Sequence, residues 1–230
     1  MTAARTDVAA AIRDSLPITV AVAPFAAVFG GLAVQAGWAP WQALLASATI
    51  FAGASQYVAL DLWGRAVPAW AIVLTVFAVN FRHVLYSASI GRRMGAWAPW
   101  KRALCFAFMV DPAFAAADAR ARTHGLTFAY FLAYGAALWV GWMAMNAVGV
   151  VFGALIENPE RWGLDFILPI YFLALVVGMR GQRRFAGIVV VSALVAVSVQ
   201  VVAGSPWHIM AGGVAGMAYA ALRPAPTVPA

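Results

Sequence analysis

Residues 68–90 read PAWAIVLTVFAVNFRHVLYSASI, an apolar run that holds an arginine close to its middle. At 1.5 Å per residue, a helix of this length crosses the roughly 30 Å hydrocarbon core of a membrane. An arginine at the centre of such a helix costs about 2.5–3.5 kcal/mol on insertion scales. We therefore expect Arg82 to face a partner, a cavity or a transport path rather than lipid.

The composition is that of a membrane protein throughout. The chain is 64% hydrophobic and 10% charged, with a mean hydropathy of +0.86, whereas soluble domains carry roughly 25% charged residues. We predict an all-α, polytopic helical membrane protein with one integral membrane domain over 1–222 and a disordered tail over 223–230. The net charge of +7 comes from short basic loops, which favour anionic lipid headgroups over nucleic acid.

Loop charge predicts the topology. The loop at 91–102 carries four basic residues and no acid, the loop at 180–184 is basic, and the loop at 157–165 is acidic. Both basic loops belong on the cytoplasmic side. Apolar segments lie at about 16–37, 40–62, 67–90, 103–119, 126–156, 164–180, 185–203 and 206–222.

Three segments separate the two basic loops, so these loops share a side only if one segment does not cross. Segment 103–119 is the best candidate, because Pro112 breaks its helix after Asp111. We predict about seven crossings, one or more discontinuous or re-entrant segments, and an N-terminus outside. We identify no internal sequence repeat.

Polar residues in segment 67–90 form two neighbouring helical faces. Asn80, His83 and Ser87 share one face by their spacing. The adjacent face carries Arg82, Tyr86 and Ser89. A histidine can exchange protons near neutral pH, and an arginine can hold a carboxylate of the protein or of a substrate.

Asp111 is the only carboxylate deep within an apolar segment. An unpaired charge there is very costly, so we expect Asp111 to be protonated or to face Arg82 or water. It is a candidate for proton coupling together with His83. The alternatives are a purely structural Arg82–Asp111 pair, with His83 as a core residue, or helix capping around Pro112.

Segment 40–62 contains a second candidate binding region. Gly53 and its small neighbours allow another backbone or a ligand to approach closely. Ser55 and Gln56 add polar groups, and the Gln56 amide needs hydrogen-bond partners in hydrocarbon. Helix–helix packing explains the same residues equally well, and Asn146 and Gln35 are more readily explained as packing contacts.

Several kinds of site are absent from the sequence. The single cysteine, Cys105, excludes an intramolecular disulfide. No metal-ligand spacing, phosphate-binding loop or nucleophile elbow is present, so we expect neither a metal nor a cofactor.

Three stretches together resemble the AzlC family, the large subunit of two-component branched-chain amino-acid exporters. They are residues 51–56 (FAGASQ), residues 80–87 (NFRHVLYS) and Asp111 with the following residues 113–115. The resemblance extends from about Ser15 to the C-terminus. The family usually has a second acidic residue after the aspartate, where this chain has Pro112.

The resemblance implies a multi-pass protein of the bacterial inner membrane that is not an enzyme. It implies proton-driven export of hydrophobic amino acids, together with a small AzlD-type membrane subunit. The substrate site would then comprise Gly53, Ser55, Gln56, Asn80 and Arg82, with Asp111 and His83 in proton coupling.

Two other classes of protein remain open from the residues alone. One is a channel-like or structural membrane subunit. The other is a membrane-embedded enzyme that uses His83 and Asp111 as base and acid.

Overall fold

A computed structural model of the chain describes residues 2–63, 67–153, 184–204 and 207–222, together with 166, 170, 173, 176, 177, 180 and 181. All regular elements in these ranges are helices, which confirms the predicted class. They are α1 (Thr2–Gln35), α2 (Pro40–Ile50), α3 (Gly53–Leu62), α4 (Ala69–Asn80), α5 (Arg82–Gly91), the 3-10 helix η1 (Arg92–Met94), α6 (Pro99–Ala107), α7 (Asp111–Thr123), α8 (Phe128–Gly153), α10 (Phe185–Ala203) and α11 (Trp207–Leu222).

Four helical stretches in the described part of the chain are long and apolar enough to cross a membrane. They are Arg5–Gln35, Ala69–Met94, Phe128–Gly153 and Phe185–Ala203. The acidic loop 157–165, most of segment 164–180 and the tail 223–230 lie outside the described residues. The number of about seven crossings therefore stays a prediction.

The helices form two compact units. Unit 1 comprises Met1–Asp61 and Asn80–Leu164, and unit 2 comprises Leu62–Val79 and Asp165–Ala230. In unit 2, α10 packs on α11 with Gly187 against the Tyr219 ring. The single domain expected over 1–222 is not tested by this division and stays a prediction.

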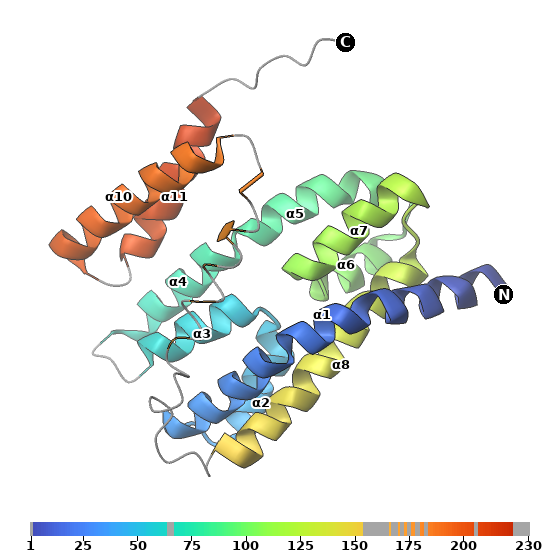
Figure 1. Cartoon of the computed structure of the whole chain (residues 1–230), viewed down its shortest axis with the longest axis horizontal. Coiled ribbons are helices and arrows are strands. Elements are labelled where there is room, and N and C mark those ends of the chain that lie inside the picture. The colour runs from blue at the N-terminus through green and yellow to red at the C-terminus, as the bar shows by residue number, and fades with distance from the viewer. Residues whose placement is uncertain are drawn as a thin grey trace. The chain divides into compact units, whose positions relative to one another are not determined.

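Unit 1 is built on α1 and α8, which lie side by side in Figure 1 and pack against each other more extensively than any other described pair. Ala27 meets Gly149, and four residues later Gly31 meets Gly153. The contacts advance in the same direction along both helices, so α1 and α8 run parallel. Side chains at Gly149 or Gly153 would overlap the backbone of α1, so small residues permit this close approach.

Segment 103–119 is broken, as predicted, and its two arms form a hairpin. Helix α6 ends at Ala107, and α7 starts at Asp111 with Pro112 in its first turn. Trp100, at the start of α6, contacts Phe128 at the start of α8. Arg120, near the end of α7, pairs with Asp7 of α1. Hairpin 2 (99–123) thus returns to the end of the α1–α8 pair at which it began (Figure 1).

Segment 40–62 is broken as well, which sequence analysis did not predict. Between α2 and α3 lies Phe51, whose φ of 28° is rare for a residue with a side chain. Trp38, just before α2, and Tyr57 of α3 both contact the Phe29 ring of α1. Hairpin 1 (40–61) therefore enters from the opposite end of the α1–α8 pair.

The tips of the two hairpins meet beside α8. The ring centroids of Phe51 and Phe108 lie 6.4 Å apart. Phe108 also contacts the Trp139 ring, and the Trp139 indole N–H donates to the Ala48 carbonyl at 3.3 Å. Each hairpin thus extends part of the way along the pair and ends against the other.

The hairpins begin with the same short sequence motif, which sequence analysis did not single out. Residues 38–41 and 97–100 both read Trp-Ala-Pro-Trp. In each copy the alanine is extended, with φ/ψ of −64°/147° at Ala39 and −57°/144° at Ala98, and the proline opens the helix. Two copies that enter from opposite ends are the mark of an inverted repeat.

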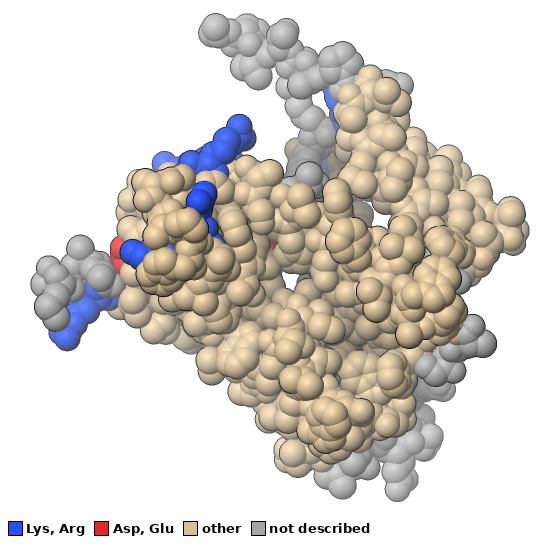
Figure 2. All heavy atoms as spheres, turned by 180° about the vertical axis from the view of Figure 1, so that it is seen from behind, with Lys and Arg blue, Asp and Glu red and all other residues tan. Residues whose placement is uncertain are grey.

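The N-terminus lies at the same end of unit 1 as the basic loop 91–102. Arg93 pairs with Asp118 of α7, and Arg120 of the same helix pairs with Asp7. Figure 2 shows basic side chains gathered at this end of unit 1. An external N-terminus and a cytoplasmic basic loop therefore cannot both hold, and we predict that the N-terminus shares the cytoplasmic side with the loop.

Cysteine labelling tests this placement. In a Cys105→Ala background, Arg5→Cys and Arg92→Cys should react with a membrane-impermeant maleimide from the same side of the membrane. Ala36→Cys, at the other end of α1, should react from the opposite side. All three positions are exposed. Opposite-side labelling of residues 5 and 92 would contradict the arrangement.

A second prediction concerns the contact between hairpin 1 and α8. A Cβ at Gly53 would lie 2.9 Å from Cη2 of Trp142. Gly53→Ala should therefore overpack the contact and destabilise the protein by about 1–3 kcal/mol, seen as a lower Tm in detergent. Gly213→Ala in α11 is the matched control, because nothing lies within 4 Å of its added Cβ. Trp142→Phe, which shortens the ring, should restore part of the loss.

Candidate functional site

A small cavity lies where the interrupted helices meet. It has a volume of about 220 Å³. Hairpin 1 contributes Ile50, Phe51 and Ala52, the start of hairpin 2 contributes Phe106, Ala107 and Met109, and the α4–α5 junction contributes Asn80, His83 and Ser87. The lining is mixed, with apolar hairpin tips on two sides and polar side chains on the third.

The polar side comes from the helical face that the sequence predicted. Asn80, His83 and Ser87 all line the cavity. Asn80 is the last residue of α4, and its carbonyl oxygen lies 3.0 Å from Nδ1 of His83. Its side-chain oxygen accepts a hydrogen bond from the Ser55 hydroxyl of hairpin 1. Asn80 thus connects the α4–α5 junction to hairpin 1.

The neighbouring face holds the expected ion pair. Nη1 of Arg82 lies 3.0 Å from Oδ2 of Asp111, and the two side chains are 26% and 20% exposed. The Tyr86 hydroxyl donates to the other carboxylate oxygen, Oδ1, at 2.8 Å. Asp111 therefore has a partner on each oxygen.

Helices α5 and α7 place these charges. Arg82 opens α5 after Phe81, which keeps right-handed helical angles, so that α4 and α5 form one continuous helical stretch. Asp111 opens α7 directly after the tip of hairpin 2. A carboxylate at a helix N-terminus is stabilised by the helix dipole. Opposite charges taken out of water need such pairing and hydrogen bonding to be tolerated. Pro112, in the first turn of α7, thus helps to fix the helix start at which Asp111 stands.

Arg82 keeps unused hydrogen-bonding capacity. Its Nε is buried and has no hydrogen-bond partner in the ranges that the structure describes. A guanidinium presents five donors in a fixed fork, so one face can contact Asp111 while another accepts a further anion. The contact with Asp111 therefore leaves a donor of Arg82 unused.

None of the three predicted residues of hairpin 1 lines this cavity. The space beside Gly53 is occupied by the Trp142 ring of α8. Gln56 is buried, and its amide nitrogen donates to the Ser47 hydroxyl at 2.8 Å. Of the hairpin 1 candidates, only Ser55 reaches the cavity side, through Asn80.

Sequence analysis missed the apolar lining. Phe51, Phe106 and Met109 face the cavity but resemble every other apolar residue in the sequence. The signal that could have found them is the Trp-Ala-Pro-Trp motif, which occurs at the start of both hairpins. Two hairpins that start alike are expected to end in similar tips. Finding it required comparing the segments with one another rather than scanning each for polar residues.

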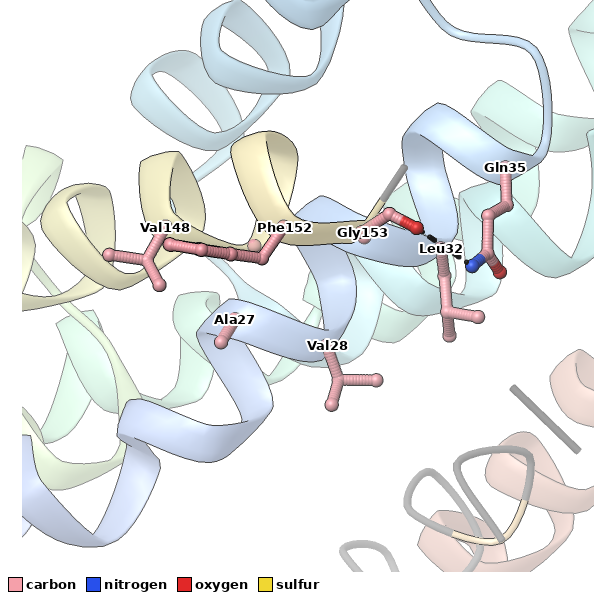
Figure 3. Close-up of a pocket in the computed structure, with 9 residues that line it drawn as sticks. Ala27, Val28, Leu32, Gln35, Val148, Phe152 and Gly153 are labelled. Carbon is pink, nitrogen blue, oxygen red and sulfur yellow. Dashed lines mark hydrogen bonds between the residues drawn. The ribbon is translucent and has the colours of Figure 1, made fainter. Parts of the chain in front are cut away.

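A second cavity, of about 160 Å³, lies between α1 and α8. Figure 3 shows Val28, Leu32, Val148 and Phe152 along it, with the Gln35 amide bonded to the Gly153 carbonyl at its end. Gln35 is thus a packing contact, as expected. Among the residues that the structure describes, this cavity is lined by apolar groups and by no charged side chain.

No metal centre is evident in the described residues, where no three His, Cys, Asp or Glu side chains come together as ligands. The polar side chains that line the cavity are those of Asn80, His83 and Ser87, and the Arg82–Asp111 pair lies on the neighbouring helical face rather than in the lining.

Comparisons with known proteins agree with this picture of a membrane protein. The chain is 31% identical over 211 residues to the inner membrane protein YgaZ of Escherichia coli, an alignment covering 89% of this chain and 85% of that protein. It is 29% identical to an uncharacterized membrane protein of Archaeoglobus fulgidus over 76% of this chain and 77% of the relative. No solved structure gives a significant match.

A third relative carries a functional name. The branched-chain amino acid transport protein AzlC of Bacillus subtilis is 28% identical over 197 residues, which cover 80% of this chain and 74% of that protein. The family model for the AzlC protein matches residues 17–156, a range that includes both hairpins and every predicted site residue. The predicted membrane location and the resemblance are thus confirmed, and the chain belongs to the AzlC family.

Proposed function

We propose that this protein exports branched-chain and other hydrophobic amino acids across the bacterial cytoplasmic membrane. Export is coupled to the proton gradient and requires a small AzlD-type membrane subunit. The observation that carries the proposal is the cavity of about 220 Å³ at the helix breaks, flanked by the Arg82–Asp111 pair. Pockets for drug-sized ligands are about 300–1,000 Å³, so this one suits a smaller solute.

The groups at the cavity match the three parts of such a substrate. Arg82 takes the carboxylate in a charge-assisted contact. Asp111 and Asn80 take the ammonium, and the apolar tips with Phe51, Phe106 and Met109 surround the side chain. Discontinuous helices at mid-membrane are the usual substrate sites of transporters built from inverted repeats. The name of the Bacillus subtilis relative supports the same substrate class.

Proton coupling follows if Asp111 is shared. The carboxylate binds either the substrate ammonium or a proton, so loading one releases the other. His83 lines the cavity and can carry the proton between Asp111 and water. Because a proton and the substrate ammonium exclude each other on Asp111, protons that move inward drive amino acids outward.

Efflux from cells that also express a small AzlD-type subunit tests the proposal. Preloaded leucine, valine, isoleucine and methionine should leave faster than from cells without the transporter, whereas lysine and glutamate should not. Arg82→Ala should reduce leucine efflux at least tenfold, and Arg82→Lys should recover only part, because lysine lacks the planar fork. Leucine efflux at the wild-type rate by both Arg82 variants would contradict the proposed substrate site. Movement of an unrelated solute alone would contradict it as well.

Proton coupling has a separate test in vesicles. Asp111→Asn cannot exchange a proton, so an imposed pH gradient should no longer drive leucine transport. Exchange of labelled for unlabelled leucine should persist with a raised KM, since it needs no net proton movement. Equal gradient-driven transport by wild type and Asp111→Asn would exclude Asp111 as the coupling residue. Flow independent of any gradient in wild type would favour a channel-like subunit.

A further inference from the structure

Hairpin 1 and α8 enclose a second polar group of side chains, distinct from the cavity. This inner layer consists of Ser47 of α2, Gln56 of α3, and Trp142 and Asn146 of α8. Ser47 and Asn146 are fully buried, and Gln56 and Trp142 are 1% and 8% exposed. None of the four lines the cavity beside Asn80.

The inner layer is short of hydrogen bonds. The Gln56 amide nitrogen donates to Ser47. The remaining polar atoms are Oε1 of Gln56, Nε1 of Trp142 and both amide atoms of Asn146, and none has a partner within the described part of the chain. Buried polar groups in proteins are nearly always paired, so four orphan atoms in one layer are unusual.

The first turn of α3 begins beside Trp142 of α8. Gly53 contacts the Trp142 ring, and Gln56 and Asn146 lie one helical turn further along α3 and α8. Beside Gln56, the Tyr57 hydroxyl reaches the Phe25 carbonyl of α1. Ala27, two residues later, contacts Gly149 of α8. The first turn of α3 therefore runs in the same direction along α8 as α1 does.

The orphan atoms are costly as they stand. Each unsatisfied buried group destabilises the fold by its lost hydration, whereas an apolar side chain of the same shape is nearly neutral. The Asn146 amide alone leaves both its donor and its acceptor unused. A layer that served packing alone would be more stable with leucine at this position.

We propose that the inner layer is a second binding site for the zwitterionic head group of the transported amino acid, occupied when hairpin 1 moves away from α8. The ammonium donates to the amide oxygens of Gln56 and Asn146. The carboxylate accepts from the Trp142 indole and the Asn146 amide nitrogen. Neutral donors and acceptors in equal supply suit a ligand that carries both charges.

The inverted arrangement of the hairpins supports this assignment. The tip of hairpin 2 borders an open cavity, while α3 of hairpin 1 is closed against α8. In transporters with inverted repeats, one repeat moves against the other to expose the site alternately. Opening hairpin 1 would expose the inner layer to the other side. The inference rests on the proposed amino-acid transport.

Asn146→Leu tests the inner layer. It removes two orphan atoms at similar volume, so Tm should rise or stay unchanged, while leucine efflux should fall at least tenfold. Thr49→Val on the exposed side of α2 is the control, because its hydroxyl bonds only within its own helix; efflux should stay within twofold of wild type. Efflux by Asn146→Leu within twofold of wild type would overturn the proposal and leave only a tolerated packing defect.

A second measurement does not depend on how Asn146→Leu folds. In a Cys105→Ala background, Ser47→Cys should react slowly with a small water-soluble thiol reagent while transport is active, and saturating leucine should protect it. Absence of any labelling during transport would show that the layer never opens and would also overturn the proposal. If the wild type moves no amino acid at all, the proposed function fails instead.

Discussion

Hydrocarbon offers no hydrogen-bond partner to the backbone groups that an interrupted helix leaves free, and this constraint shapes unit 1. Interruptions at membrane depth are tolerated only inside protein or beside water. The breaks at Phe51 and 108–110 therefore lie against each other and beside α8. The close α1–α8 pair supplies the rigid support on which both hairpins rest. The cavity is a consequence of bringing the breaks together.

The same arrangement explains how an arginine and an aspartate persist in an apolar chain. Asp111 stands at the first position of α7, where free backbone N–H groups and the helix dipole stabilise a carboxylate, and Arg82 is stabilised by its pairing with that carboxylate. Replacing the pair by apolar residues would stabilise many proteins. Its retention at the point where the hairpin tips converge favours a ligand-dependent role over a purely structural one.

The sequence predicted the fold class, the broken segment at Pro112, the two polar faces around Arg82 and the Arg82–Asp111 pair. Each of these depends on local chemistry: proline geometry, helical spacing, and the cost of unpaired charge. The break at Phe51 carried no such signal, because a phenylalanine with positive φ is held by tertiary contacts with Phe108. The sequence favours a packing role for Asn146. Only the assembled helices α1, α3 and α8 show that its buried amide lacks hydrogen-bond partners.

The two copies of Trp-Ala-Pro-Trp differ in the residues directly after them. The first continues with Gln42 and Ala43, and the second with Lys101 and Arg102. Two similar hairpins that insert in opposite directions need a signal that sets their orientation. Positive charge, which is retained on the cytoplasmic side, provides such a signal. The two basic residues after the second motif thus distinguish the orientation of hairpin 2 from that of hairpin 1. Moving them to the first motif would favour insertion of the whole molecule in the opposite orientation.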